Sequence, residues 1–203
     1  MTADTIGTRF ERQAAATPDN LAVVTDELSL TYRELDVMAS RIAGGLAILP
    51  SDSDRPIALL MSEGPLLYAA MLGAAKAGRI FFVLAVTSPE PWLSALVAES
   101  SAACILTDSS WYAVAVRVAG TKATVLEVDR IGALAVPAMA ELARSPNAPA
   151  CIVYTSGSMG RSKGVLLSHR IVRIFKWSCS GSSQRTEWQI CCPQVPLPVW
   201  AMF

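Results

Sequence analysis

Residues 57–86 read IALLMSEGPLLYAAMLGAAKAGRIFFVLAV, and this stretch indicates the fold of the chain. It holds two continuous apolar runs, Ile57–Met61 and Ile80–Val86, separated by a helix-compatible segment, Leu66–Ala77. Apolar runs that are continuous rather than alternating are typical of strands covered on both faces of a sheet. We therefore expect a strand–helix–strand unit here.

Most of this stretch, Leu66–Val86, is also long and apolar enough to be considered as a membrane span. Lys76 and Arg79 oppose that interpretation, because each would cost about 2.5–3.5 kcal/mol near the centre of a membrane helix. Gly78 lies between them and is a favourable residue for ending a helix. We expect no contact with a membrane.

The alternation of strands and helices continues along the chain to residue 154. Further strand-type runs are expected at Ala102–Leu106, Ala123–Val128 and Ala150–Tyr154, and further helices at Pro91–Glu99, Ser110–Ala119 and Ile131–Ala143. Crossover helices of this length join parallel strands. The fold class is therefore α/β, with a mainly parallel layered sheet flanked by helices.

The N-terminal residues follow a different pattern. Thr8–Ala16 is typical of a helix that ends at Thr17-Pro18. Leu21–Thr25 and Leu28–Thr31 are predicted to be two strands, and Tyr32–Leu46 is predicted to be an amphipathic helix with Leu35, Met38, Ile42 and Leu46 on one face.

Composition excludes several classes of function. Lys plus Arg and Asp plus Glu number 17 each, so the net charge is zero and no basic surface is expected to bind nucleic acid. The five cysteines include no Cys-x-x-Cys pair, and the single histidine, His169, leaves too few ligands for a zinc site. Met1–Arg9 lacks the order of a secretory signal, so the expected location is the cytoplasm.

The sequence YTSGSMGRSKG at residues 154–164 follows a strand-type run and is rich in groups that bind phosphate. Glycines allow the backbone amides to approach an anion closely, and consecutive amides form a concave anion site. Hydroxyl groups add donors, and a lysine adds a mobile positive charge. The candidate nucleotide-binding residues are Thr155, Ser156, Gly157, Ser158, Gly160, Lys163 and Gly164.

From composition alone, the same residues also fit an ordinary surface loop, because Ser, Gly and Lys are common in loops. The loop is not a Walker motif, which has Gly-Lys-Ser/Thr after four free positions. Here Ser162 precedes Lys163 and Gly164 follows it.

The run Tyr-Thr-Ser-Gly-Ser-x-Gly-x-x-Lys-Gly resembles the phosphate loop of the adenylate-forming superfamily, that is, the AMP-dependent synthetases and ligases or AMP-binding enzymes. Two upstream segments resemble other motifs of that superfamily in the same order, namely Leu30–Leu35 (LTYREL) and Gly73–Gly78 (GAAKAG) followed by Ile80–Val86. Phe10–Asp19 resembles the start of the amino-acid adenylation domains of nonribosomal peptide synthetases.

The resemblance implies an ATP-dependent reaction in two halves. A carboxylate and ATP give an acyl- or aminoacyl-adenylate and pyrophosphate, and the acyl group then passes to a thiol, such as that of a carrier protein. By analogy, the seven candidate residues hold the β- and γ-phosphates of ATP while the carboxylate attacks, a step governed by positioning and charge stabilisation. Mg²⁺ is expected to accompany the triphosphate.

The chain departs from the superfamily pattern at three places, two of them in the loop. Met159 stands where the family has threonine, and the loss of that hydroxyl is expected to cost roughly 1.5–3 kcal/mol in phosphate binding. Ser162 replaces a proline, which raises the entropy cost of ordering the loop. Thr87-Ser88-Pro89 replaces a stiffer segment after the upstream strand.

The resemblance covers residues 6–176. We expect residues 1–176 to form a partial N-terminal adenylation (AMP-binding) domain, and residues 177–203 to be an unrelated tail that is disordered or read out of frame. Motifs that bind adenine, ribose and the carboxylate follow this loop in the family, so the expected function is that of a truncated carboxylate-activating domain, inactive by itself and without a catalytic residue of its own.

The alternative interpretation is a non-enzymatic fragment that binds nucleotide or docks with a separately encoded remainder of the enzyme. A kinase or NTPase with another kind of phosphate loop is disfavoured, because no acidic metal-binding motif follows the next strand. His169 is expected to start a helix or to fill space, and Arg170 and Arg173 are expected to lie on a solvated helix face.

Overall fold

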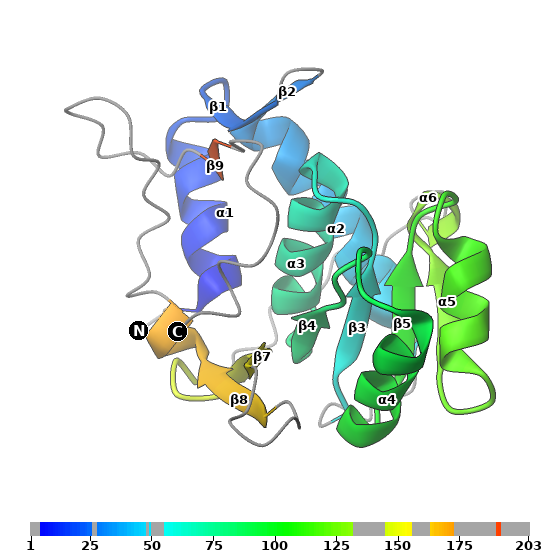
Figure 1. Ribbon diagram of the computed structural model, residues 1–203. Helices are drawn as coiled ribbons and strands as arrows, with labels where there is room; N and C mark the ends of the chain where they lie inside the picture. The colour runs from blue at the N-terminus through cyan, green and yellow to red at the C-terminus, as the bar shows by residue number, and fades with distance from the viewer. Residues whose placement is uncertain are drawn as a thin grey trace.

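The main sheet of the computed structural model has the strand order β6-β5-β3-β4-β7-β8. The strands are β3 (Ile57–Leu60), β4 (Phe81–Val83), β5 (Cys104–Thr107), β6 (Thr124–Glu127), β7 (Pro149–Thr155) and β8 (Lys163–Ser168). The structure describes residues 5–25, 28–47, 49, 55–131, 145–155, 163–172 and 190–191. The first five strands along the sheet are parallel, and β8 runs antiparallel to β7. The expected mainly parallel α/β sheet is confirmed (Figure 1).

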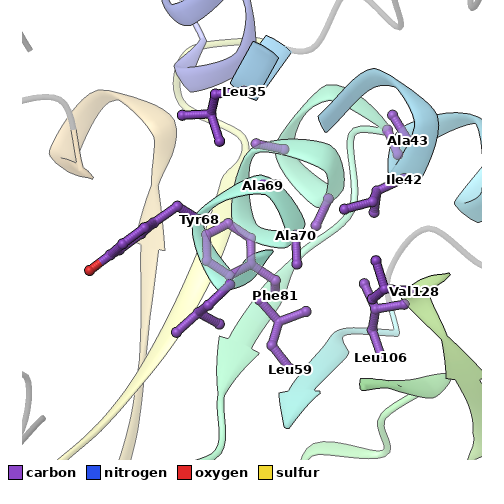
Figure 2. Packing of buried hydrophobic residues seen from close by; sticks show 14 of the residues in the cluster. Leu35, Ile42, Ala43, Leu59, Tyr68, Ala69, Ala70, Phe81, Leu106 and Val128 are labelled. Atoms are coloured by element: carbon purple, nitrogen blue, oxygen red, sulfur yellow. The ribbon is translucent and has the colours of Figure 1, made fainter. Parts of the chain in front are cut away.

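From β3 to β6, where the structure describes every connection, the crossovers between the strands are the helices α3 (Pro65–Lys76), α4 (Glu90–Ser100) and α5 (Tyr112–Ala119). Neighbouring residues of β3 face opposite sides of the sheet, so that Leu59 belongs to one apolar cluster and Leu60 to the other. The cluster with Leu59 is covered by α1, α2 and α3, as Figure 2 shows for part of it, and the other is covered by α4 and α5. Burial on both faces explains why the strand sequences are continuously apolar.

The helix α2 (Tyr32–Ala47) packs against α3 through small residues. A Cβ on Gly73 would lie 2.8 Å from the Cβ of Ile42 and 2.9 Å from the carbonyl oxygen of Ala39, so only glycine fits without movement. Helix α3 ends at Lys76 with Ala77 as its C-cap, and the expected stop residue, Gly78, follows with φ 62°. The N–H of Gly78 donates to Ala75 O and that of Arg79 to Ala74 O, which satisfies two carbonyls of the last turn.

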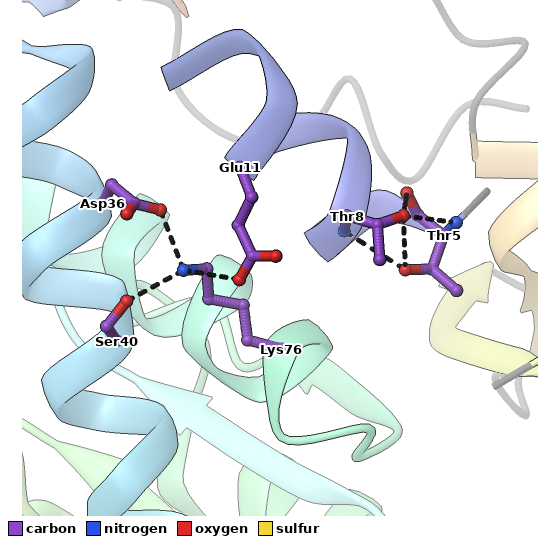
Figure 3. Close-up of polar contacts among 6 residues, drawn as sticks. All are labelled: Thr5, Thr8, Glu11, Asp36, Ser40 and Lys76. Carbon is purple, nitrogen blue, oxygen red and sulfur yellow. Dashed lines mark hydrogen bonds and ion pairs between the residues drawn. The ribbon is translucent and has the colours of Figure 1, made fainter. Parts of the chain in front are cut away.

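Lys76 joins three helices through a nearly buried polar cluster. Its Nζ lies 2.8 Å from Oε1 of Glu11 on α1 and 2.8 Å from Oδ1 of Asp36 on α2, and it donates a hydrogen bond of 2.8 Å to Ser40 Oγ (Figure 3). The Lys76 side chain is 8% exposed, whereas those of Glu11 and Asp36 are 45% and 30% exposed. The lysine therefore reaches its partners from the interior, and the two carboxylate side chains are partly exposed, although the Asp36 Oδ1 that faces the lysine is buried.

The N-terminal elements pack beside this cluster. Helix α1 (Ile6–Ala16) begins with a capping box, in which Thr8 N–H donates to Thr5 Oγ1 and Thr5 N–H donates to Thr8 Oγ1. The predicted strand pair is confirmed as the antiparallel β1 (Leu21–Val24) and β2 (Ser29–Thr31).

Three short elements come later in the chain. A two-residue strand, β9 (Ile190–Cys191), lies parallel to β1. The helix α6 (Val128–Ile131) follows β6, and the helix α7 (His169–Val172) follows β8.

Two features differ from the sequence expectations or lie beyond them. The antiparallel strand β8 was not expected, because its apolar core of Val165, Leu166 and Leu167 is too short to identify without its partner strand. The predicted helix Ile131–Ala143 falls, from residue 132 on, outside the described residues. Within the ranges that the structure describes, no helix is sufficiently long and apolar to span a bilayer.

Candidate phosphate-binding hairpin

The hairpin of β7 and β8 brings the two ends of the candidate phosphate loop together. Thr155 is the last residue of β7, Lys163 is the first of β8, and the two are paired across the strands. Thr155 Oγ1 also donates a hydrogen bond of 3.4 Å to the carbonyl oxygen of Lys163. Residues 156–162 connect this pair and include Ser156, Gly157, Ser158 and Gly160, which lie outside the described residues along with Met159 and Ser162.

The loop end of the hairpin, where Thr155 pairs with Lys163, lies at an edge of the sheet that favours ligand binding. Strand β7 is parallel to β4, so Thr155 lies at the same edge as the carboxyl end of β4. The chain leaves β4 through α4 towards β5, on the far side of β3, whereas it leaves β7 towards β8 in the opposite direction. In α/β proteins, ligands bind outside the carboxyl ends of the parallel strands, and this is the edge of the sheet where Thr155 lies.

Tyr154 and Gly164 form the next pair of the hairpin and fit tightly against one another. A Cβ on Gly164 would lie 3.2 Å from Cε1 of Tyr154 and 3.1 Å from Cγ2 of Ile152, so the missing side chain leaves room for the ring. The Tyr154 ring also contacts Phe82 of β4 edge to face, with centroids 5.5 Å apart. Gly164 thus has a packing reason to be glycine in addition to the phosphate role that the sequence suggests.

The groups of the hairpin differ in exposure and in charge. Lys163 is exposed and Thr155 is half-buried, so an ammonium and a hydroxyl are accessible beside the connecting residues. On the same strand as Thr155, burial raises the pKa of the Cys151 thiol to about 11, and burial also raises the pKa of the Tyr154 phenol. Both of these groups are neutral near pH 7, which leaves Lys163 as the charged group of the described residues in β7 and β8.

His169 lies at the other end of β8 from Lys163 and does not join the candidate site. It begins α7, is 2% exposed, and accepts a hydrogen bond at Nδ1 from the backbone N–H of Ile6. Arg170 beside it is exposed, and Arg173 lies outside the described residues. His169 is therefore a helix-starting, packed residue, as the sequence suggested.

Two other polar features were not predicted from the sequence. Glu11, Asp36 and Lys76 are far apart in the sequence and meet only because α1, α2 and α3 pack together. Asp36 could have been noticed in the sequence, because it is an acidic residue next to the buried Leu35 on an amphipathic helix. Trp111 Nε1 donates to Ser62 Oγ at 2.9 Å near the carboxyl ends of β3 and β5, a contact that no spacing in the sequence indicates.

The family model described as AMP-binding enzyme matches residues 10–197. A plipastatin synthase of Bacillus subtilis is 32% identical over 174 residues, which cover 85% of this chain and 7% of that protein. The N-(5-amino-5-carboxypentanoyl)-L-cysteinyl-D-valine synthase of Amycolatopsis lactamdurans is 32% identical over 175 residues, 85% of this chain and 5% of that protein. The chain therefore spans only a small part of the length of these relatives.

Solved structures agree with the sequence relatives. The N-terminal subdomain of NpsA from Klebsiella oxytoca, in complex with 3-hydroxyanthranilyl-AMSN, is 26% identical with a TM-score of 0.72, and the match covers 84% of this chain and 42% of that subdomain. The nonribosomal peptide synthetase FmoA3, in its α-methyl-L-serine-AMP bound form, is 31% identical with a TM-score of 0.75 over 85% of this chain and 19% of that protein. The chain belongs to the AMP-binding enzyme family of adenylate-forming proteins, and it corresponds to part of their N-terminal subdomain.

Proposed function

We propose that this chain supplies the triphosphate-binding loop of an ATP-dependent, carboxylate-activating adenylation domain. The observation that carries the proposal is the pairing of Thr155 with Lys163 at the loop end of the β7–β8 hairpin, beside the carboxyl end of β4. The residues that hold the β- and γ-phosphates in this proposal are Thr155, Ser156, Gly157, Ser158, Gly160, Lys163 and Gly164.

In the reaction, a carboxylate oxygen bonds to the α-phosphorus, and the bond from that phosphorus to the oxygen bridging to the β-phosphate breaks. Pyrophosphate then carries away the electron pair of that bond, and negative charge grows on it. Lys163 is placed to offset this charge, because an exposed ammonium beside the loop can follow the departing phosphates. Backbone amides and hydroxyls of the loop hold the phosphates in position.

Mg²⁺ is proposed to enter this site with the nucleotide. Among the residues that the structure describes, no group of three or more His, Cys, Asp or Glu side chains is arranged to hold a metal. Phosphate oxygens and water are ligands that Mg²⁺ prefers, so the triphosphate itself offers a fitting set. The metal would neutralise phosphate charge in the same region as Lys163.

The thiol acceptor in this proposal is a carrier protein, as suits a relative of nonribosomal peptide synthetases. The match covers 84% of this chain and 42% of the NpsA N-terminal subdomain, so we expect the chain to bind nucleotide weakly and not to activate a carboxylate unaided. A role that uses ATP, together with the buried free thiols of Cys104 and Cys151, supports a place in the cytoplasm.

Isothermal titration of the 203-residue chain with ATP and Mg²⁺ tests this function. Lys163→Ala is expected to weaken binding by roughly 10- to 100-fold, the cost of one charge-assisted contact. Lys122→Ala is the matched control, because Lys122 is an exposed lysine in the turn after α5 and removing it deletes the same charge elsewhere. Equal binding by all three proteins, or none by the wild type, would contradict the proposal.

A second candidate function is a non-enzymatic module that docks with a separate remainder of the domain. The observation that favours it is the exposed apolar surface of β8, where Val165 and Leu166 are 44% and 52% exposed. The ATP titration separates the two candidates, because neither expects ATP–pyrophosphate exchange by the chain alone. Binding that Lys163→Ala weakens supports the triphosphate-binding loop, whereas a folded chain that binds no ATP supports the docking module.

A further inference from the structure

The hairpin that frames residues 156–162 is held at its far end by a buried histidine. His169 follows β8 directly, and its Nδ1 accepts a 3.4 Å hydrogen bond from the backbone N–H of Ile6 in the first turn of α1. Figure 1 shows α7 beside this end of α1. A ring nitrogen that accepts a hydrogen bond carries no proton, so the contact requires the imidazole form with its proton on Nε2.

Helix α1 is a firm anchor for this contact. Its first turn is fixed by the capping box of Thr5 and Thr8, and Glu11 one turn further forms the ion pair with Lys76 of α3 (Figure 3). Gly7 lies against the backbone of the same lysine, because a Cβ on Gly7 would be 3.3 Å from the Lys76 Cα. Helix α1 is thereby fixed to α3, which packs on the sheet, and His169 connects the end of β8 to this fixed element.

Strand β8 ends the sheet as the structure describes it, so a contact with another element adds to what holds its register. In the part of the chain that the structure describes, β8 pairs along one side only, with β7. A slip by one residue would turn every side chain of β8 to the opposite face. Either Lys163 or Val165 would then meet the Tyr154 ring in place of Gly164, and Lys163 would no longer pair with Thr155.

Backbone contacts on either side of His169 hold the same register. The N–H of His169 donates to Ala148 O at 3.1 Å, and the N–H of Arg170 donates to Pro146 O at 2.8 Å. These bonds fix where the chain leaves β8, but they belong to the hairpin itself. The contact of His169 with Ile6 joins the hairpin to a separate element through a hydrogen bond, in addition to the packing of Leu167 and Val172 against the core.

We propose that His169 is a positioning residue that sets the register of β8 and, through it, the place of Lys163 beside Thr155. The effect of His169 on nucleotide binding rests on the proposed function. Its effect on the register of β8 does not depend on that function. The residue acts through the strand, from the end of β8 opposite Lys163.

The experiment uses nuclear magnetic resonance of the 203-residue chain with labelled histidine, glycine and tyrosine. Because the chain has one histidine, its ring nitrogen signals are unambiguous. Wild type is compared with His169→Leu, which lacks an acceptor, and with His169→Asn, whose amide oxygen can replace Nδ1. Arg170→Ala is the matched control, because Arg170 is the exposed neighbour of His169 on α7.

The readouts are the tautomer of His169, the contact between the Gly164 α-protons and the Tyr154 ring, and amide exchange along β8. We expect an unprotonated Nδ1 in the wild type, and ring-shifted Gly164 α-protons in wild type, Arg170→Ala and His169→Asn. In His169→Leu we expect that contact to be lost and exchange along β8 to become roughly tenfold faster, the effect of losing one net hydrogen bond.

A proton on Nδ1 in the wild type would overturn the proposal, as would His169→Leu that keeps the contact between Gly164 and Tyr154. If His169→Leu does not fold, the result for His169→Asn decides. A folded His169→Asn chain that keeps the contact between Gly164 and Tyr154 supports the proposal. Loss of that contact, or of the fold, in His169→Asn overturns it. ATP titration of the same proteins gives the functional arm. Failure of the wild type to bind ATP would remove the proposed function and leave the register result standing.

Discussion

Gly73 of α3 lies against Ile42 of α2 so closely that a Cβ on the glycine would stand 2.8 Å from the Cβ and Cγ2 of the isoleucine. The contact lies between two helices that cover the same face of the sheet, where Ala74 is also fully buried. Ala69 and Ala70 of α3 are fully buried as well and are labelled in Figure 2. Small residues on α3 let α2 approach closely, so both helices can cover the face that contains Leu59.

Gly73→Ala is therefore expected to destabilise the chain. When the contact cannot relax, overpacking should cost about 1–3 kcal/mol. Alanine gains roughly 1 kcal/mol over glycine in a helix, so the overpacking should outweigh this gain. The measurement is the free energy of unfolding in urea. Gly64→Ala is the control, since a Cβ there meets nothing within 4 Å and its cost at the helix start should be at most about 1 kcal/mol. A Gly73→Ala chain as stable as the wild type would contradict the close contact.

Lys76→Met is expected to destabilise the chain because it leaves Asp36 and Glu11 without their shared cation. Breaking a fully buried pair costs about 3–5 kcal/mol, but both carboxylates here are partly exposed, so we expect about 1–3 kcal/mol. Urea unfolding of Arg33→Gln provides the comparison, because Arg33 pairs with Asp19 on the surface and its loss should cost less than about 1 kcal/mol.

A second substitution distinguishes an electrostatic role of Lys76 from a purely steric one. Asp36→Leu added to Lys76→Met removes the carboxylate that was left unpaired, and it should recover part of the lost stability. If the double variant is less stable than Lys76→Met, then Asp36 contributes through packing or other contacts instead.

The buried thiols give a pH-dependent prediction. Burial raises the pKa of Cys104 to about 12, against the opposing influence of the Arg79 and Arg55 charges, and burial raises the pKa of Cys151 to about 11. Each folded pKa lies above the unfolded value of about 8.5, so the stability that the neutral thiols contribute is present below about pH 8.5. It is lost as the pH rises from there through about 11 and 12.

The free energy of unfolding measured between about pH 8 and pH 11 checks this prediction, and alkylation followed by peptide mapping checks the burial on which it depends. Near pH 8 the native chain should leave Cys104 and Cys151 unmodified, because a thiol must be ionised and accessible to react, and both should react fully in concentrated guanidinium. Modification of either residue without global unfolding would show that the strands β5 and β7 open more easily than their burial indicates.

Met159→Thr is expected to strengthen ATP binding by the chain. The resemblance to the family's loop places a threonine at this position, and a thioether supplies no hydrogen-bond donor to a phosphate. A restored hydroxyl contact should lower the Kd by roughly 10- to 100-fold in isothermal titration, and Met159→Ser should share most of the gain. Weaker or unchanged binding in both variants would indicate that this side chain does not face the phosphates.

Much of the fold was predictable because the strand sequences respond to burial on both faces. Ile57–Met61 and Ala102–Leu106 were expected as buried strands, and the structure has β3 and β5 within one or two residues of those bounds. The strand β8 was missed, because Val165–Leu167 becomes a strand only by pairing with β7. Of the candidate site residues, the structure describes Thr155, Lys163 and Gly164, and the phosphate roles of all seven remain predictions.

By itself, the sequence determined the alternation of strands and helices, the helix end at Gly78 and the family resemblance of residues 154–164, since apolar period, glycine conformation and motif chemistry are all local properties. Only the tertiary structure decided the strand order, the meeting of Lys76 with Glu11 and Asp36, and the contact of His169 with Ile6 across 163 positions of the chain. Such contacts depend on how packed elements bring distant residues together, and no local pattern specifies that.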